Sequence, residues 1–83
     1  MKNDSVEVLL QAERQRFMAL VEGYECVLDY QLSERNIDFT HTYVSSDLRG
    51  RGVAEKLVRA GLSWARQENY LIKASCSYVQ KFL

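Results

Sequence analysis

The sequence has no proline and only four glycines among its 83 residues. It also has no apolar run near the ~20 residues of a transmembrane helix, and its first residues lack the apolar core of a signal peptide. With 47% hydrophobic and 27% charged residues, the composition is typical of a soluble globular protein. We therefore expect a single soluble domain over residues 1–83, with one thin core and no membrane partner.

Cysteine is equally scarce. Cys26 and Cys76 lie far apart, in neither CxxC nor CxxH spacing. The absence of these spacings argues against a zinc site or another metal site. Two isolated cysteines favour reduced thiols in a cytoplasmic setting.

The net charge is zero, but basic side chains are scarce in the first half of the chain and acidic ones in the second. Residues 1–47 carry four basic and nine acidic side chains, and residues 48–83 carry seven basic and two acidic ones. The imbalance is either chance or the sign of a polyanion bound by the second half and a cationic partner of the first. Because no dense stripe of Lys and Arg alternates with aromatic residues, nucleic acid is not an expected partner.

Strand patterns occupy the first half of the chain. β-branched and aromatic residues in partial alternation predict three strands, over residues 13–21, 24–32 and 37–44. Glu22-Gly23 supplies the first turn between them, and a polar loop supplies the second. These strands form an antiparallel meander.

A helical period then replaces the alternation. It predicts a helix from about Gly52 to Gln67 that ends at Asn69, a residue that tolerates the left-handed conformation. A short strand over 71–75 and a short helix over 76–83 follow. The fold class is therefore α+β: an antiparallel β-meander, then a helix, a parallel strand and a short C-terminal helix packed in layers.

Two of the four glycines, Gly50 and Gly52, lie between Arg49 and Arg51 where the long helix begins. Glycine there lowers the stability of the helix, but it removes the Cβ that would keep an anion away from the backbone. The first N–H groups of a helix have no intrahelical partner, and the helix dipole adds about half a positive charge. The pattern predicts a phosphate-binding loop, with an ordinary glycine-containing loop as the alternative.

The same stretch, R-G-R-G-V-A over residues 49–54, resembles the signature R/Q-x-x-G-x-G/A of the GCN5-related N-acetyltransferases. F-T-H-T at 39–42, L-V-R-A-G-L-S-W-A-R at 57–66 and C-S-Y-V at 76–79 resemble small single-domain members of that superfamily. The resemblance covers residues 12–82. It implies the minimal acyl-coenzyme A N-acyltransferase fold, with acetyl-coenzyme A as cofactor and a small or exposed amine as acceptor.

The resemblance also implies where the cofactor binds. Backbone N–H groups of Arg51, Gly52, Val53 and Ala54 would bind the pyrophosphate, with Arg49 and Gly50 completing the loop. The backbone near Thr42, Tyr43 and Val44 would receive the pantetheine arm. Larger members have further strands that shape the acceptor site, so the resemblance describes the cofactor half better than the acceptor half.

Three side chains are candidates for the chemistry. Cys76, at the end of the fourth strand, is expected to be a thiolate that takes the acetyl group, a thiol that protonates coenzyme A, or an inert buried cysteine. His41 shares a strand face with apolar residues, which favours a hydrogen-bonded core histidine, with a general base or a partner of Cys76 as the alternative. Tyr78 is either a proton donor or a packed aromatic residue, and Cys26 is expected in the core.

The first hypothesis is thus an acetyl-coenzyme A-dependent N-acetyltransferase, monomeric or weakly dimeric. The alternatives are a module that binds coenzyme A or acyl-coenzyme A without efficient turnover, and a structural or partner-binding domain whose glycine loop binds nothing.

Overall fold

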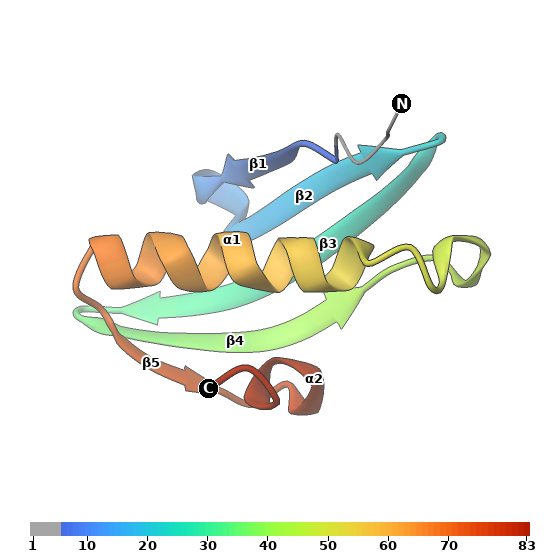
Figure 1. Ribbon diagram of the computed structural model, residues 1–83. Helices are drawn as coiled ribbons and strands as arrows, with labels where there is room; N and C mark the ends of the chain where they lie inside the picture. Colours follow the sequence, from blue (N-terminus) through green and yellow to red (C-terminus); the bar gives the residue numbers. More distant parts are fainter. Residues whose placement is uncertain (1–5) are drawn as a thin grey trace.

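The computed structural model of the protein describes residues 6–83 (Figure 1). Its elements follow the predicted order, with one additional strand at the start and two short 3-10 turns. They are β1 (Val8–Gln11), η1 (Ala12–Arg14), β2 (Arg16–Val21), β3 (Tyr24–Ser33), β4 (Asn36–Tyr43), η2 (Ser46–Leu48), α1 (Val53–Gln67), β5 (Leu71–Ala74) and α2 (Ser77–Gln80).

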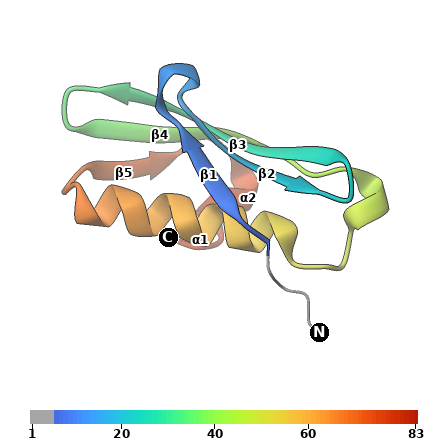
Figure 2. The ribbon, with the colours of Figure 1, turned by 90° about the horizontal axis from the view of Figure 1, so that it is seen from above.

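The strands form one mixed sheet in the order β1-β2-β3-β4-β5. The first four are antiparallel, and β5 lies parallel to β4, so α1 forms the crossover between them. Figure 2 shows α1 along one face of this sheet. The predicted α+β class, with an antiparallel meander followed by a helix and a parallel strand, is confirmed.

The N-terminal edge differs from the prediction. The strand expected over 13–21 begins only at Arg16, because Ala12–Arg14 form a 3-10 turn and Gln15 adopts a left-handed φ of 51°. The chain reverses there, and Val8–Gln11 pair with β2 as an edge strand that the sequence did not reveal. Four residues are too few for a recognisable alternation.

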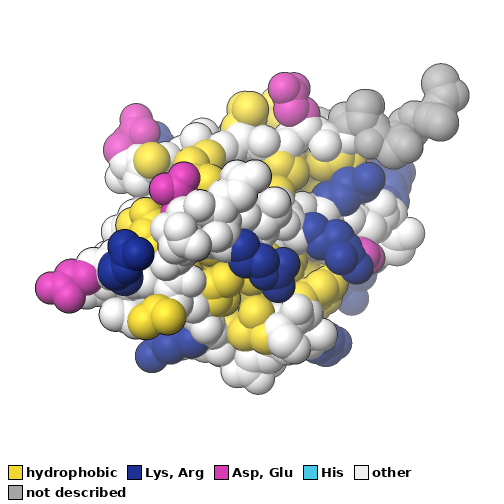
Figure 3. Space-filling model, turned by 60° about the vertical axis from the view of Figure 1, so that its left-hand side comes forward, with side chains coloured by type: hydrophobic (Ala, Val, Ile, Leu, Met, Phe, Trp, Pro, Cys, Tyr) yellow, Lys and Arg dark blue, Asp and Glu magenta, His cyan; other side chains and the backbone are white. Residues whose placement is uncertain are grey.

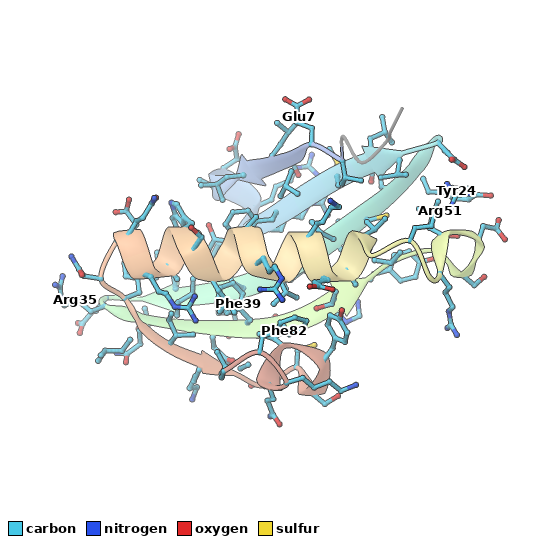
Figure 4. All side chains as sticks on the ribbon, in the orientation of Figure 1. Glu7, Tyr24, Arg35, Phe39, Arg51 and Phe82 are labelled. Carbon is cyan, nitrogen blue, oxygen red and sulfur yellow. The ribbon has the colours of Figure 1, made fainter. Side chains whose placement is uncertain are left out.

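The core lies between α1 and the sheet. The buried residues of α1 recur at helical spacing, as the predicted helical period requires; they are Val53, Leu57, Val58, Gly61, Leu62 and Ala65. The face they form packs on Phe17, Leu28 and Phe39, each under 5% exposed. Figure 4 labels Phe39 beside α1. Burying one such large apolar side chain contributes about 1.5–3 kcal/mol.

Aromatic packing closes one end of this core. The ring of Trp64 lies 5.6 Å from that of Phe17, 5.5 Å from that of Tyr30 and 5.4 Å from that of Tyr70, measured between centroids. These separations suit tilted and edge-to-face contacts. Trp64 and Tyr70 therefore pack against the core.

The C-terminal helix is shorter than predicted, with only Ser77–Gln80 in α2. Val79 is fully buried, and Phe82 lies under the Arg59 guanidinium of α1 at 5.6 Å. Leu83 is 59% exposed and does not join the core. Figure 3 shows Lys and Arg side chains spread among apolar ones on one face of the molecule. No helix within residues 6–83 combines the length and the apolar character needed to cross a membrane.

Candidate functional site

The sheet opens between β4 and β5. β3 pairs with β4 up to Tyr43, whereas β5 pairs with β4 only over Asn36–Phe39. Beyond Phe39, no strand within residues 6–83 covers the outer edge of β4. A cavity of about 450 Å³ lies beside this opening, lined by Thr42, Val44, Leu48, Arg49, Gly50, Gly52, Val53, Ala54, Glu55 and Tyr78. It therefore brings together the predicted phosphate loop, the end of β4 and α2.

The two glycines of the loop have the backbone conformation that glycine favours. Gly50 has φ of 81° and Gly52 has φ of 76°, both in the left-handed region. A Cβ built on either residue would meet no atom within 4 Å. These glycines thus serve the turn and leave the backbone approachable, instead of relieving a packing clash.

The start of α1 offers hydrogen-bond donors that no group within residues 6–83 uses. Gly52 caps the helix without a side-chain hydrogen bond, and the first ladder bond runs from the Lys56 N–H to the Gly52 carbonyl at 3.1 Å. Within the described chain, the backbone N–H groups of Gly52, Val53, Ala54 and Glu55 have no acceptor. Four adjacent donors at the positive end of a helix dipole fit a pyrophosphate.

Arg51 departs from its expected place. Its N–H donates to the Leu48 carbonyl at 3.3 Å, so it is not among the free donors. Its guanidinium forms an ion pair with Glu22 in the β2–β3 turn (Figure 4). The Arg51 side chain is therefore paired with Glu22, whereas the exposed Arg49 lines the cavity.

A second contact ties the loop to the same turn. The Tyr24 hydroxyl donates a hydrogen bond to the Asp47 carboxylate, and this bond raises the pKa of Tyr24. The loop is thus fastened at two points, at Asp47 within the 3-10 turn η2 and at Arg51 after it. Such fastening reduces the ordering cost of binding a ligand there.

A β-bulge decides which side chains of β4 face the cavity. Asp29 is paired with His41 and Tyr30 with Phe39, which leaves Thr40 as the extra residue. Because a bulge shifts the alternation by one, Thr42 comes to line the cavity.

The bulge also corrects one sequence-based prediction. His41 is exposed, so the expected core histidine is wrong. Its alternative role, as a base or partner of Cys76, stays a prediction without a contact to support it. The Tyr43 side chain is 50% exposed and does not line the cavity, and the predicted contact of its backbone with the cofactor stays a prediction.

Cys76 lies where β5 leaves the sheet. Its N–H donates to the Phe39 carbonyl at 3.0 Å, and its Sγ lies 3.5 Å from Thr42 Oγ1. Partial burial opposes ionisation, but hydrogen bonds from the Thr42 hydroxyl and from the backbone of Val79, Tyr78 and Thr42 outweigh it and lower the pKa of Cys76. Sequence reasoning missed this side-chain role of Thr42, because only the bulge brings the two residues together.

The other cysteine has the opposite environment. Cys26 is fully buried, which confirms its predicted place in the core, and burial raises the pKa of its thiol. The fold therefore disfavours the thiolate at Cys26 and favours it at Cys76.

Tyr78 lines the cavity from α2. Burial, followed by the nearby charge of Glu55, raises the pKa of Tyr78 despite the opposing effect of Arg59. Its hydroxyl therefore keeps its proton at neutral pH. Within residues 6–83 no three His, Cys, Asp or Glu side chains are grouped so that they could hold a metal ion.

A mixed sheet that opens between β4 and β5, beside a helix that begins at a glycine loop, is the architecture of an acetyltransferase-like domain. The sequence model of the family described as GCN5-related N-acetyl-transferase matches residues 16–83. The chain therefore belongs to this family, as the resemblance of its motifs indicated.

Individual relatives agree with this assignment. The protein NATD1 of Bos taurus is 34% identical over 73 residues, which cover 84% of this chain and 65% of that protein. NATD1 of Gallus gallus is 31% identical, over 94% of this chain and 74% of that protein. A solved structure from Staphylococcus aureus, described as GCN5-like, is similar with a TM-score of 0.72 at 28% identity, over 96% of this chain and 79% of that one.

Proposed function

We propose that the protein binds acetyl-coenzyme A in the cavity beside β4 and transfers the acetyl group to a small or exposed amine. The observation that supports this most is the row of four unpartnered backbone N–H groups at the start of α1. They line a cavity that continues along the open edge of β4 toward Thr42. A linear cofactor with a diphosphate at one end and a thioester at the other suits that layout.

The binding roles follow from the contacts. The N–H groups of Gly52, Val53 and Ala54 hold the pyrophosphate, and Arg49 adds positive charge. The free backbone edge near Thr42 and Val44 binds the amide groups of the pantetheine arm, as an added strand would.

Acetyl-coenzyme A, when bound, supplies an activated thioester. The hydrogen bonds at Cys76 Sγ favour the thiolate at this position. The Tyr78 hydroxyl, which keeps its proton, is the better candidate for the donor that a leaving group requires.

Binding is tested by adding coenzyme A to the ¹⁵N-labelled protein and following its amide resonances. We expect the largest shifts at residues 49–55 and at Thr42, with little change at the β2–β3 turn around Gly23. Unchanged spectra at millimolar coenzyme A would exclude the cofactor and with it the proposal.

Turnover is tested by the release of free thiol from acetyl-coenzyme A with a panel of polyamines, amino acids and lysine peptides. We expect release with at least one acceptor, reduced in the variant Cys76→Ala. Mass spectrometry shows whether acetyl resides on Cys76 during turnover. Binding without thiol release for any amine would leave a coenzyme A-binding module instead of an enzyme.

The proposal includes a cytoplasmic location and a monomer or weak dimer. Both cysteines are free thiols, which suits a reducing compartment. Light scattering during gel filtration measures the oligomeric state.

A further inference from the structure

The corner that carries Cys76 is fastened to β4 by an acidic residue to which no role has been given so far. Asp38 accepts two hydrogen bonds from Ser75, one from its N–H to Oδ1 at 2.8 Å and one from its hydroxyl to Oδ2 at 2.7 Å. Both oxygens of one carboxylate thus hold the residue directly before Cys76. Charge-assisted bonds of this kind are shorter and stronger than neutral ones.

Further contacts continue this attachment along β4. Beside Asp38, the Phe39 carbonyl accepts the Cys76 N–H at 3.0 Å. Past the bulge, Thr42 Oγ1 lies 3.5 Å from Cys76 Sγ. Since β5 pairs with β4 no further than Ala74, these contacts replace the ladder and determine where the thiol lies.

We propose that Asp38 is a positioning residue of the acetyl-transfer site, which holds Cys76 Sγ against Thr42 through its paired hydrogen bonds to Ser75. This inference rests on the proposed function of Cys76. Asp38 touches neither the cavity nor the thiol, so it acts only through Ser75.

Other charged or titratable groups lie on the neighbouring elements. Lys73 on β5 is the register partner of Asp38, and His41 lies farther along β4. Tyr78 on α2 is under the influence of Glu55 and Arg59 on α1. The side-chain hydrogen bond to Cys76 Sγ comes from Thr42 and from none of these groups.

The test uses the rate at which iodoacetamide alkylates Cys76, measured from pH 6 to 10 by mass spectrometry on the full chain. Only the thiolate reacts, so the rate profile gives the pKa of the thiol. In Asp38→Ala, Sγ loses its fixed contact with Thr42, and we expect alkylation at neutral pH to slow by about three- to tenfold.

The direction of this change separates positioning from charge. Removing a nearby negative charge would by itself favour the thiolate and make alkylation faster. In Asp38→Asn the amide can still accept the Ser75 N–H and can donate to the Ser75 hydroxyl, so we expect a rate close to that of the wild type. Faster alkylation in both variants, or an unchanged profile in Asp38→Ala, overturns the proposal.

Two controls complete the experiment. Asp29→Ala removes a carboxylate on the adjacent strand and is expected to leave the alkylation rate unchanged; an equal slowing there would overturn a specific role for Asp38. If Asp38→Ala does not fold, Ser75→Ala removes one of the two bonds, and we expect about twofold slower alkylation. An unchanged rate in folded Ser75→Ala would then reject the proposal.

Because alkylation needs no cofactor, the positioning role of Asp38 and the proposed function can be refuted independently of each other. Slower alkylation with no binding of coenzyme A would refute the function and keep the positioning role. Normal binding with unchanged alkylation would refute the positioning role alone. With an acceptor in hand, we further expect Asp38→Ala to lower kcat while KM for acetyl-coenzyme A stays the same.

Discussion

The pair formed by α1 and β4 has two regions, a closed half where β5 pairs with β4 and an open half beside the cavity. Glycine has opposite uses in these two regions. In the closed half, around Gly61 and Phe39, a Cβ on Gly61 would lie 2.7 Å from Leu28 Cδ2 and 3.0 Å from Phe39 Cε1. In the open half, around Gly52 and Thr42, a Cβ on Gly52 would meet nothing within 4 Å. Gly61 lets the helix lie on the sheet, whereas Gly52 shapes a turn and leaves backbone N–H groups available.

The two halves of the α1–β4 pair therefore contribute to different properties of the protein. The closed half supplies stability, with β5 paired to β4 and apolar side chains buried against α1. The open half leaves backbone N–H groups without an acceptor among residues 6–83, and the proposed ligand would supply one. A change in the closed half should affect folding, and a change in the open half should affect binding.

The largest expected effect is in the closed half. Gly61→Val places a branched side chain against Leu28 and Phe39, and overpacking of this kind costs about 2–3 kcal/mol of unfolding free energy. Urea denaturation measures the loss. Ser63→Val, at an exposed position of the same helix, is the matched control and should change stability by less than about 0.5 kcal/mol. Equal stability of the Gly61 variant and the wild type would contradict the close approach of helix and sheet.

The next effect belongs to the open half. Gly52→Asp sets a carboxylate among the free N–H groups, where it repels phosphate and competes for the donors. We expect the Kd for coenzyme A, measured by calorimetry, to rise about tenfold or more.

Gly23→Asp is the matched control for this variant, since Gly23 has a similar φ of 84° and also lies in open space. It should lose a similar amount of stability through backbone strain and leave the Kd unchanged. If both variants weaken binding equally, the anion site is not at the start of α1.

A smaller effect on coenzyme A affinity is expected from the two arginines of the loop, and it should differ between them. Arg49→Ala removes a guanidinium that lines the cavity and should weaken coenzyme A about threefold at low salt. Arg51→Ala removes a side chain already paired with Glu22, so its effect should stay below about twofold. The difference should shrink as ionic strength rises. A larger loss in Arg51→Ala would mean that its pair with Glu22 opens in favour of the ligand.

The smallest effect concerns the ionisation of Cys76. Its pKa is lower in the folded protein than in the unfolded chain, so the unfolded state binds the thiol proton more tightly. The resulting stabilisation is present above the ordinary cysteine pKa of about 8.5, and it is lost as pH falls through the folded-state pKa.

The stability difference between the wild type and Cys76→Ser should therefore be larger near pH 9 than near pH 6, as measured by urea unfolding. The raised pKa of Cys26 has the opposite effect, but it is common to both proteins and cancels. A difference that does not change with pH would show that the thiolate is not stabilised in the fold.

Much of the architecture was accessible from the sequence because its signals are local. The helical stripe predicted α1, Glu22-Gly23 predicted a turn at which both residues have positive φ, and Asn69 has the predicted left-handed φ of 63°. β1 was missed because four residues at an edge carry too little pattern. The start of β2 was placed too early because nothing local marks the left-handed Gln15.

The sequence by itself indicated where the backbone could turn and where an anion could approach it, because glycine at positions 50 and 52 permits the positive φ that both residues adopt. Only the tertiary structure decided which side chains meet in the open half. The bulge at Thr40 depends on how β3 and β4 align, and it turns Thr42 toward Cys76 while leaving His41 exposed. Strand register is set by packing over the whole sheet, and no single stretch of the chain encodes it.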